Sequence, residues 1–246
     1  MQLAIVTGTS RGIGAAVARE LLERDWRVMG CARGPAAPGL GGERYHHRTL
    51  DLADTGAVKR WFEGGFPATS DIAAAERVGL VNNAAVLGTD LVEDLDLAAT
   101  VRALTVNVAV PVWLAGLVLR HAPDCPVRVV DLSSGAATSA VPGWAAYCAG
   151  KAALHMAGTV LAEELAQAPA LAGRDLRLVS YAPHVVATSM QEEIRATSPE
   201  RFPCLEAFID LEREGRLVGA EGPAREIADL LASDDLPPHS TRRFEP

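Results

Sequence analysis

Short apolar runs rich in β-branched residues alternate along the chain with longer stretches whose apolar residues recur at helical spacing. Six short runs predict strands: Leu3–Thr7, Arg27–Ala32, Arg44–Thr49, Gly79–Asn82, Val127–Leu132 and Leu176–Tyr181. Four longer stretches predict helices: Ile13–Glu23, Thr55–Glu63, Leu97–His121 and Ala145–Ala166. Strands that alternate with helices form right-handed βαβ units. The predicted fold class is therefore α/β, a doubly wound parallel sheet in a three-layer αβα sandwich.

The pattern loosens after the sixth predicted strand. Helical signals around Gln191–Ala196 and Glu206–Arg213 are interrupted by prolines, and the last predicted strand, His239–Phe244, is short and rich in arginine. In a doubly wound sheet, residues 188–219 would lie beyond a strand's carboxyl end, where ligands bind. We expect them to form a substrate lid on a single domain spanning residues 1–246. The Gly- and Pro-rich stretch Gly34–Gly42 is too short and too early to separate two cores.

Composition narrows the classes of function. The chain has 246 residues, 49% of them hydrophobic, and its net charge of −8 argues against a nucleic-acid partner. Its cysteines and histidines show no spacing typical of a metal site or a disulfide framework. The uncharged run Ala103–Leu119 contains Asn107 and Pro111 and is shorter than the roughly 20 residues of a spanning helix, so we expect a core helix and no membrane. Without a leader-like amino end, the expected location is the cytoplasm.

A glycine cluster follows the first predicted strand and opens the first predicted helix. Glycines at 8, 12 and 14 permit a tight turn, close approach of a pyrophosphate and tight packing of the helix on the strand. The first backbone N–H groups of that helix attract phosphates. A glycine cluster alone is weak evidence, but its position between a strand and a helix favours a dinucleotide site. The candidate cofactor contacts here are Gly8, Ser10, Arg11, Gly12, Ile13 and Gly14.

The second predicted strand indicates which dinucleotide binds. Sites for NAD place Asp or Glu at its end, to accept hydrogen bonds from the ribose, and a 2′-phosphate repels that carboxylate. Here the strand ends in Cys31 and Ala32, and Arg33 follows at once. Arg33 and Arg11 suit bidentate phosphate binding, although either alone could be a solvated surface charge. We therefore predict NADP(H) as the cofactor. After the third strand, Asp51 either lies beside the adenine or caps the next helix.

Ser134, Tyr147 and Lys151 are candidate catalytic residues. Tyr147 and Lys151 are four residues apart, so both project from one face of a predicted helix. Such pairs also occur by chance on helix surfaces, but this one follows a strand that ends in two serines. Reducing a ketone requires an acid that gives a proton to the developing alkoxide. An ammonium about 4 Å from the phenol would contribute about 4 kcal/mol, or roughly three pKa units, before desolvation. We therefore expect a lowered Tyr147 pKa, with Ser134 binding the substrate oxygen.

In this order and spacing, the motifs resemble those of the short-chain dehydrogenase/reductase family over nearly the whole chain. The residues that carry the resemblance are Thr7–Gly14, Asp51, Leu52, Asn82–Ala84, Asn107, Ser134, Tyr147, Lys151, Ala182, Pro183 and Thr188. The resemblance implies a Rossmann-type sheet and a catalytic Ser–Tyr–Lys–Asn group. In that group Asn107 orders a water in a proton relay to Lys151, and Lys151 also holds the nicotinamide ribose. The further cofactor contacts that it implies are Asp51, Leu52, Asn83, Tyr147, Lys151, Pro183, Val186 and Thr188.

Two positions depart from the family pattern. Ala85 stands where the family has glycine, which is tolerable if the backbone there does not need positive φ. His184 stands where glycine usually follows the proline; it either shapes the substrate pocket and flanks the nicotinamide or is a tolerated surface histidine.

Within the family, the region from Tyr181 to Gln191 resembles the sepiapterin reductase and benzil reductase branch, whose members reduce vicinal dicarbonyl groups. Arg243 stands where pteridine reductases carry an anchoring aspartate, which favours an apolar diketone or another ketone over a pteridine. We therefore predict a small carbonyl substrate and an NADPH-dependent carbonyl reductase. The candidate pocket residues, each also plausible as ordinary packing, are Val141, Trp144, His184 and Met190.

Two other functions remain open at this point. One is an NAD-dependent alcohol dehydrogenase. The other is a non-catalytic dinucleotide sensor, although sensors commonly lose the tyrosine or lysine that this chain keeps. Members of the family usually assemble through their two long helices, so the resemblance implies a homodimer or homotetramer through Leu97–His121 and Ala145–Ala166.

Overall fold

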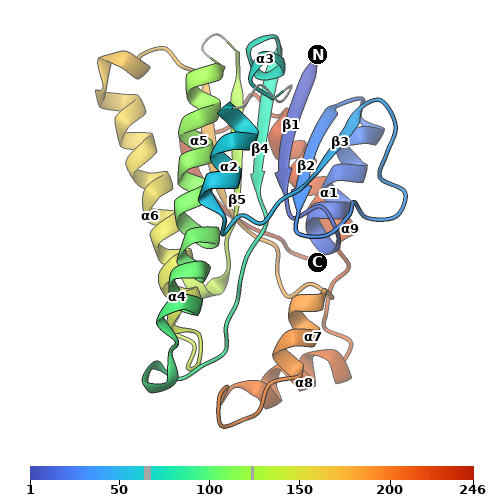
Figure 1. Ribbon diagram of the computed structural model, residues 1–246, viewed down its shortest axis with the longest axis vertical. Helices are drawn as coiled ribbons and strands as arrows, with labels where there is room; N and C mark the ends of the chain where they lie inside the picture. Colours follow the sequence, from blue (N-terminus) through green and yellow to red (C-terminus); the bar gives the residue numbers. More distant parts are fainter. Residues whose placement is uncertain (64–67, 123–124) are drawn as a thin grey trace.

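Seven parallel strands form one sheet in the computed structural model, which describes residues 1–63, 68–122 and 125–246 (Figure 1). The order across the sheet is β3-β2-β1-β4-β5-β6-β7. Chain order reverses between β1 and β4, and the carboxyl ends of these strands mark the crevice where ligands bind in such sheets. The strands are β1 (Gln2–Thr7), β2 (Arg27–Ala32), β3 (Tyr45–Thr49), β4 (Arg77–Asn82), β5 (Val127–Leu132), β6 (Leu176–Ala182) and β7 (His239–Arg243).

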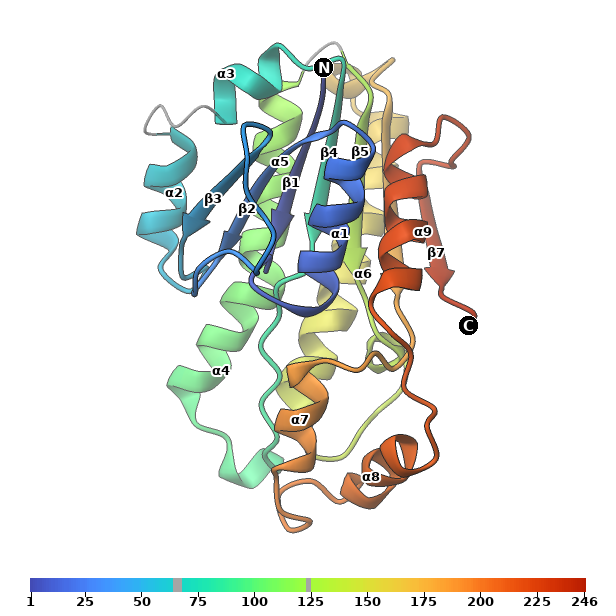
Figure 2. The same ribbon diagram turned by 90° about the vertical axis from the view of Figure 1, so that its right-hand side faces the viewer.

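Helices cover both faces of the sheet (Figure 2). Alternate side chains of β1 enter opposite cores: Leu3 and Ile5 belong to one buried cluster, Ala4 and Val6 to the other. Two-sided burial explains why the five central strands are mainly apolar, whereas the edge strands β3 and β7 are rich in polar residues. The expected doubly wound, three-layer αβα architecture is confirmed. One face carries α1 (Gly12–Glu23) and α9 (Glu221–Ala232), and the other carries α2 (Thr55–Glu63), α3 (Ala68–Ala73), α4 (Leu97–Leu104), α5 (Val110–His121) and α6 (Ala145–Gln167).

The long helix predicted over Leu97–His121 is interrupted by a π-helical turn, Thr105–Ala109, between α4 and α5. The backbone N–H of Val110 bonds to the carbonyl of Thr105, one residue further back than in an α-helix. Pro111 has no N–H to give to the carbonyl of Asn107, four residues before it. The proline therefore leaves Asn107 without its usual helical donor.

The helix Leu97–His121 is also long and apolar enough to cross a membrane by length and composition alone. Half of its most apolar stretch is buried inside the fold, and α5 contributes Leu114 and Val118 to the core. Burial against a sheet accounts for its composition.

Residues 188–219 lie beyond the carboxyl ends of the strands, where the lid was expected (Figure 2). They contain two short helices, α7 (Ser189–Arg195) and α8 (Leu205–Arg213). The two ends of this segment are joined: the Val218 N–H donates to the Val185 carbonyl at 3.0 Å, and the Ala187 N–H donates to the Val218 carbonyl at 2.9 Å. The helices α3 and α9 were not predicted, although α9 presents Ala224, Ile227, Ala228 and Leu231 to the core at helical spacing.

Candidate active site

The glycine turn between β1 and α1 has the shape that a dinucleotide pyrophosphate requires. Gly8 and Gly12 have φ of +79° and +57°, a region that favours glycine. A Cβ on Gly14 would stand 2.4 Å from the Gly8 carbonyl oxygen, so any side chain at this position would clash with the turn. Arg11, which precedes α1, makes no side-chain cap, and the first turn carries no acidic residue. The N–H groups of this helix end are thus suited to an anion, and the residues present fit the cofactor.

Polar side chains hold this turn in place. The Thr7 hydroxyl oxygen accepts from the N–H groups of Asn83 and Ala84, each at 3.0 Å, and the Asn83 amide donates to the Thr7 carbonyl at 2.8 Å. The Asn83 side chain therefore supports the turn. Ala85 is not among the described residues with positive φ, which explains why alanine replaces glycine there. From the other side, Thr188 lies beside Gly12: a Cβ on Gly12 would be 3.2 Å from the Thr188 methyl group.

The residues expected at the 2′-phosphate and beside the adenine differ in their surroundings. Arg11 and Arg33 are exposed, and neither forms an ion pair with another residue in the described part of the chain. Asp51 is held by Arg102 at 2.8 Å and accepts from the Ala53 N–H at 2.9 Å. Although burial opposes them, these bonds keep the pKa of Asp51 below its usual value. The helix α2 is capped by Asp54, which accepts from the Ala57 N–H, so the cap suggested for Asp51 belongs to Asp54.

Three further cofactor predictions fall in buried or paired positions. Leu52 is buried in the sheet core, Ile13 packs at the edge of the opposite core, and Val186 is buried and paired with Val218. Ser10 and Pro183 are half-buried.

Sequence reasoning missed a group of hydrogen-bonded side chains that supports the glycine turn. The Tyr45 hydroxyl donates to the Thr9 hydroxyl at 2.9 Å and lies 3.1 Å from His47 Nδ1. His47 in turn links β3 to the loop after β2, because His47 Nε2 lies 2.9 Å from the Gly34 carbonyl oxygen. Alternation on β3 places Tyr45 and His47 on one face, which was the available signal.

The three catalytic candidates meet at the carboxyl end of β5. The Tyr147 hydroxyl is hydrogen-bonded to Ser134, whose oxygen also accepts from the Ala136 N–H at 3.2 Å. Lys151 Nζ donates to the Leu132 carbonyl and lies 5.5 Å from the centre of the Tyr147 ring. Tyr147 and Lys151 are both buried. The predicted Ser–Tyr–Lys grouping is therefore present.

The expected lowering of the Tyr147 pKa is wrong for this arrangement. Burial raises the pKa of Tyr147 to about 12, and only the bond to Ser134 opposes it. Lys151 does not lower it, because its ammonium is bound to the Leu132 carbonyl and lies over the ring rather than at the hydroxyl. Burial also lowers the pKa of Lys151 to about 8, against the attraction of Asp131. At neutral pH the phenol keeps its proton and the amine is charged.

Asp131, which sequence reasoning passed over, lies near the end of β5, where its charge interacts with that of Lys151. Its carboxylate is buried and accepts from the Asn82 amide at 2.7 Å. Burial raises the pKa of Asp131 to about 6, although the Asn82 bond and the Lys151 charge oppose the rise. The signal was an acid near the end of a strand whose only other charged residue is Arg128.

Asp131→Asn is expected to stabilise the fold at pH 8 and to move the alkaline limb of activity downward. The folded-state pKa is raised from 3.8 to about 6, so ionising Asp131 opposes folding, by up to about 3 kcal/mol above pH 6. This opposition disappears below pH 4. Lys151 loses its counter-charge in the variant and should deprotonate below pH 8. Urea unfolding at pH 4 and pH 8, with kcat/KM against pH, measures both effects. An unmoved alkaline limb would show that Asp131 does not hold the ammonium.

An aromatic wall joins Tyr147 to the segment 188–219. The Trp144 ring lies edge-on to Tyr147 with centroids 5.5 Å apart and stacks on Phe202 at 5.1 Å. Phe208 of α8 contacts both Trp144 and Phe202. The predicted pocket residues Trp144, Val141 and Met190 belong to this cluster, whereas Phe202 and Phe208 were not predicted. His184 lies outside it, at the end of β6, with φ of +68°.

Comparison with known proteins places the chain in a family. The family model for short chain dehydrogenases matches residues 2–199, and the chain belongs to this family. A benzil reductase ((S)-benzoin forming) from Bacillus cereus is 30% identical over 254 residues, covering all of both chains. A sepiapterin reductase from Xenopus tropicalis is 30% identical over 251 residues, covering 94% of this chain and 92% of the relative.

Solved structures agree with this assignment. A short-chain dehydrogenase/reductase from Saccharomyces cerevisiae has a TM-score of 0.82 and 26% identity, over 98% of this chain and 96% of that one. One from Burkholderia vietnamiensis has a TM-score of 0.67 and 38% identity, over 81% and 93%. The protein is thus an oxidoreductase with a Rossmann-like fold that uses a nicotinamide dinucleotide on CH–OH or C=O groups.

Proposed function

We propose that this protein is an NADPH-dependent carbonyl reductase that transfers hydride to a ketone or vicinal diketone, with Tyr147 as the general acid. The observation that carries the proposal is the Ser134–Tyr147–Lys151 group, in which Tyr147 and Lys151 are buried and Tyr147 lies against an aromatic wall. When bound, the reduced nicotinamide supplies the hydride.

The chain's own residues hold the substrate oxygen and supply the proton. Ser134 already bonds Tyr147, so one carbonyl oxygen can accept hydrogen bonds from both hydroxyls. Because the Tyr147 pKa is about 12, its proton is present at neutral pH and passes to the oxygen as negative charge develops. To stabilise the phenolate that remains, the Lys151 ammonium would have to leave the Leu132 carbonyl and approach the hydroxyl.

Asn107 contributes to the reprotonation of Tyr147 through its backbone carbonyl. Its side chain is fully engaged with Val86, accepting from the N–H at 2.8 Å and donating to the carbonyl at 2.7 Å. Pro111 leaves the Asn107 carbonyl without its α-helical donor, and α6 packs closely there, with Gly150 beside the Asn107 Cβ. We infer that this carbonyl, rather than the side chain, orders the relay water beside Lys151.

The substrate class is inferred from the apolar surroundings of Tyr147. Phe208, which is half-buried and contacts Trp144, offers ring surface that suits an aryl group, and the buried Phe202 stacks on Trp144 behind it. Arg243, at the end of β7, is exposed and replaces the aspartate expected of pteridine reductases. An apolar, aryl-bearing diketone therefore fits better than a pteridine, and Arg11 and Arg33 favour NADPH over NADH.

Consumption of NADPH with a panel of benzil, a simple aryl ketone and sepiapterin tests the proposal. We expect benzil to be reduced with the highest kcat/KM, and NADPH to be preferred to NADH. A strong NADH preference in alcohol oxidation would support an NAD-dependent alcohol dehydrogenase instead. Tight NADPH binding without turnover of any carbonyl would support a non-catalytic sensor.

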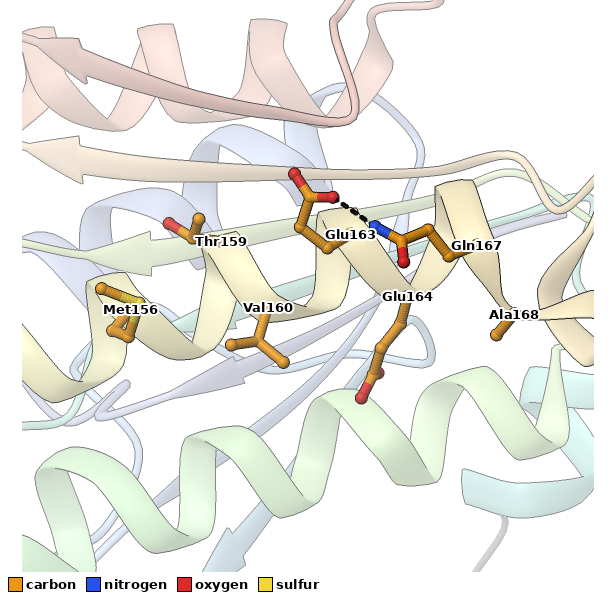
Figure 3. A pocket seen from close by; sticks show the side chains of 7 residues that line it. All are labelled: Met156, Thr159, Val160, Glu163, Glu164, Gln167 and Ala168. Carbon is orange, nitrogen blue, oxygen red and sulfur yellow. Dashed lines mark hydrogen bonds between the residues drawn. The ribbon is translucent and has the colours of Figure 1, made fainter.

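We also propose that the protein assembles as a homodimer or homotetramer through α4, α5 and α6. Exposed apolar side chains gather on these helices: Val101, Val112, Met156 and Val160, 43–59% exposed. Met156 and Val160 also line a surface hollow of about 490 Å³ along α6 (Figure 3). The hollow contains none of the catalytic residues. A second copy covering these helices would remove the apolar surface from water.

The double variant Val112→Glu, Met156→Glu is expected to be monomeric at micromolar concentration, because it places charges in an apolar interface. Light scattering of the wild type should give twice or four times the chain mass. Val92→Glu, at an exposed valine outside the three helices, serves as the control and should keep the wild-type mass. A monomeric wild type would contradict the proposal.

A further inference from the structure

His184 has an unusual backbone conformation directly after β6. Its φ of +68° lies in the left-handed region, and Asp25 is the only other non-glycine residue with positive φ among those described. Asp25 is in the turn that ends α1, where such a conformation is common. A side chain larger than that of glycine raises the free energy of this conformation, so its presence points to a role for the side chain.

The imidazole of His184 carries a second cost. Its Nδ1 is buried and has no hydrogen-bond partner in the described part of the chain. The ring's other polar atom, Nε2, is not sealed in protein and forms no hydrogen bond with another described residue. An unpaired buried polar atom destabilises a protein and calls for an explanation, of which a ligand at the site is one. Nε2 is therefore the atom available to a ligand.

Strand register places His184 at the same edge of the sheet as the catalytic group. Leu132 of β5 pairs with Tyr181 of β6, and the Ser133 N–H donates to the Tyr181 carbonyl at 2.7 Å. Ser134 and His184 follow within two and three residues of that pair, at the same edge of the sheet. Beyond His184, the chain pairs with Val218 and reaches Thr188, beside Gly12. His184 thus lies on the short connection between β6 and Thr188, the residue beside the glycine turn.

We propose that His184 is a specificity-determining residue whose Nε2 hydrogen-bonds a second oxygen of the substrate, next to the carbonyl that is reduced. The inference rests on the proposed carbonyl reductase activity. Ser134 and Tyr147 engage the reacting oxygen, and Lys151 is bound to the Leu132 carbonyl. The wall on the other side is aromatic. A vicinal oxygen therefore needs another polar partner, and His184 supplies it in place of a glycine, which has none.

A matched pair of ketones tests this assignment. The vicinal diketone 1-phenyl-1,2-propanedione and the mono-ketone propiophenone share a skeleton and differ in the second oxygen. His184→Gly should lower kcat/KM for the diketone by about 10-fold or more and change that for propiophenone by less than about threefold. Comparing each variant with the wild type cancels the difference in intrinsic reactivity. His184→Asn, which tolerates positive φ and keeps an N–H donor, should retain part of the diketone activity.

Three control measurements keep the outcomes distinct. Thermal unfolding of His184→Gly should show no loss of stability, because glycine suits φ of +68°. An equal loss of kcat/KM for both ketones would overturn the proposal. A raised dissociation constant for NADPH, with the selectivity for the diketone intact, would also overturn it. A loss of diketone selectivity in Trp144→Phe instead would assign the second oxygen to the unpaired indole N–H. If the wild type reduces neither ketone, the carbonyl reductase activity itself fails, whatever the variants do.

Discussion

Tyr147→Phe is expected to lower kcat for ketone reduction by about 10² to 10⁴-fold, the contribution of a positioned general acid. The substitution removes the hydroxyl that bonds Ser134 and keeps the ring that contacts Trp144. The fold and the glycine turn should therefore be unchanged, and the NADPH dissociation constant should stay within about twofold. Steady-state kinetics and fluorescence titration of NADPH measure the two quantities.

Tyr181→Phe is a matched control for this experiment. Tyr181 is also fully buried and loses a hydroxyl that donates to Glu226 at 2.7 Å, on the other side of the sheet from Tyr147. Its stability should fall while kcat stays close to the wild-type value. Undiminished turnover in Tyr147→Phe would assign the proton to another group.

The double variant Arg11→Ala, Arg33→Ala is expected to raise KM for NADPH by about 100-fold or more and to leave KM for NADH within about threefold. Each guanidinium can form charge-assisted bonds to a 2′-phosphate, worth about 1.5–3 kcal/mol, which NADH cannot use. Both side chains are exposed and form no ion pair among the described residues, so their loss should not disturb the fold.

Arg120→Ala controls for the loss of a surface guanidinium, because Arg120 is exposed in the last turn of α5. It should leave both Michaelis constants unchanged. Equal effects of the double variant on NADPH and NADH would place the two arginines away from the 2′-phosphate.

The sheet and the catalytic group could be predicted because their signals are local. The five central strands are mainly apolar runs, whereas the edge strands β3 and β7 are polar, and Tyr147 and Lys151 are fixed relative to each other by one helical turn. The helix α9 carries the same kind of signal but lies in the region where the prolines obscured the pattern. Local spacing was therefore sufficient for most of the fold.

The remaining parts of the site depend on contacts between distant segments. No spacing indicates that Arg102 binds Asp51 or that Phe208 reaches Trp144. The pKa of Tyr147 was predicted in the wrong direction because helical spacing gives the distance of Lys151 but not its hydrogen-bond partner or the burial of the phenol. Desolvation and competing acceptors appear only when the chain is folded.

Val218 pairs with Val185 and Ala187, so the segment 188–217 leaves the body of the protein and returns to it at the same point. Its length is then uncoupled from the sheet, since doubling a flexible loop costs only about 0.6 kcal/mol of closure entropy. Insertions and deletions within residues 188–217 can change the part of the protein that covers Tyr147 while the strands stay in register. Sequence differences between relatives that accept substrates of different size should therefore concentrate in this segment. Grafting the segment between relatives should transfer substrate selectivity without changes to Ser134, Tyr147 and Lys151.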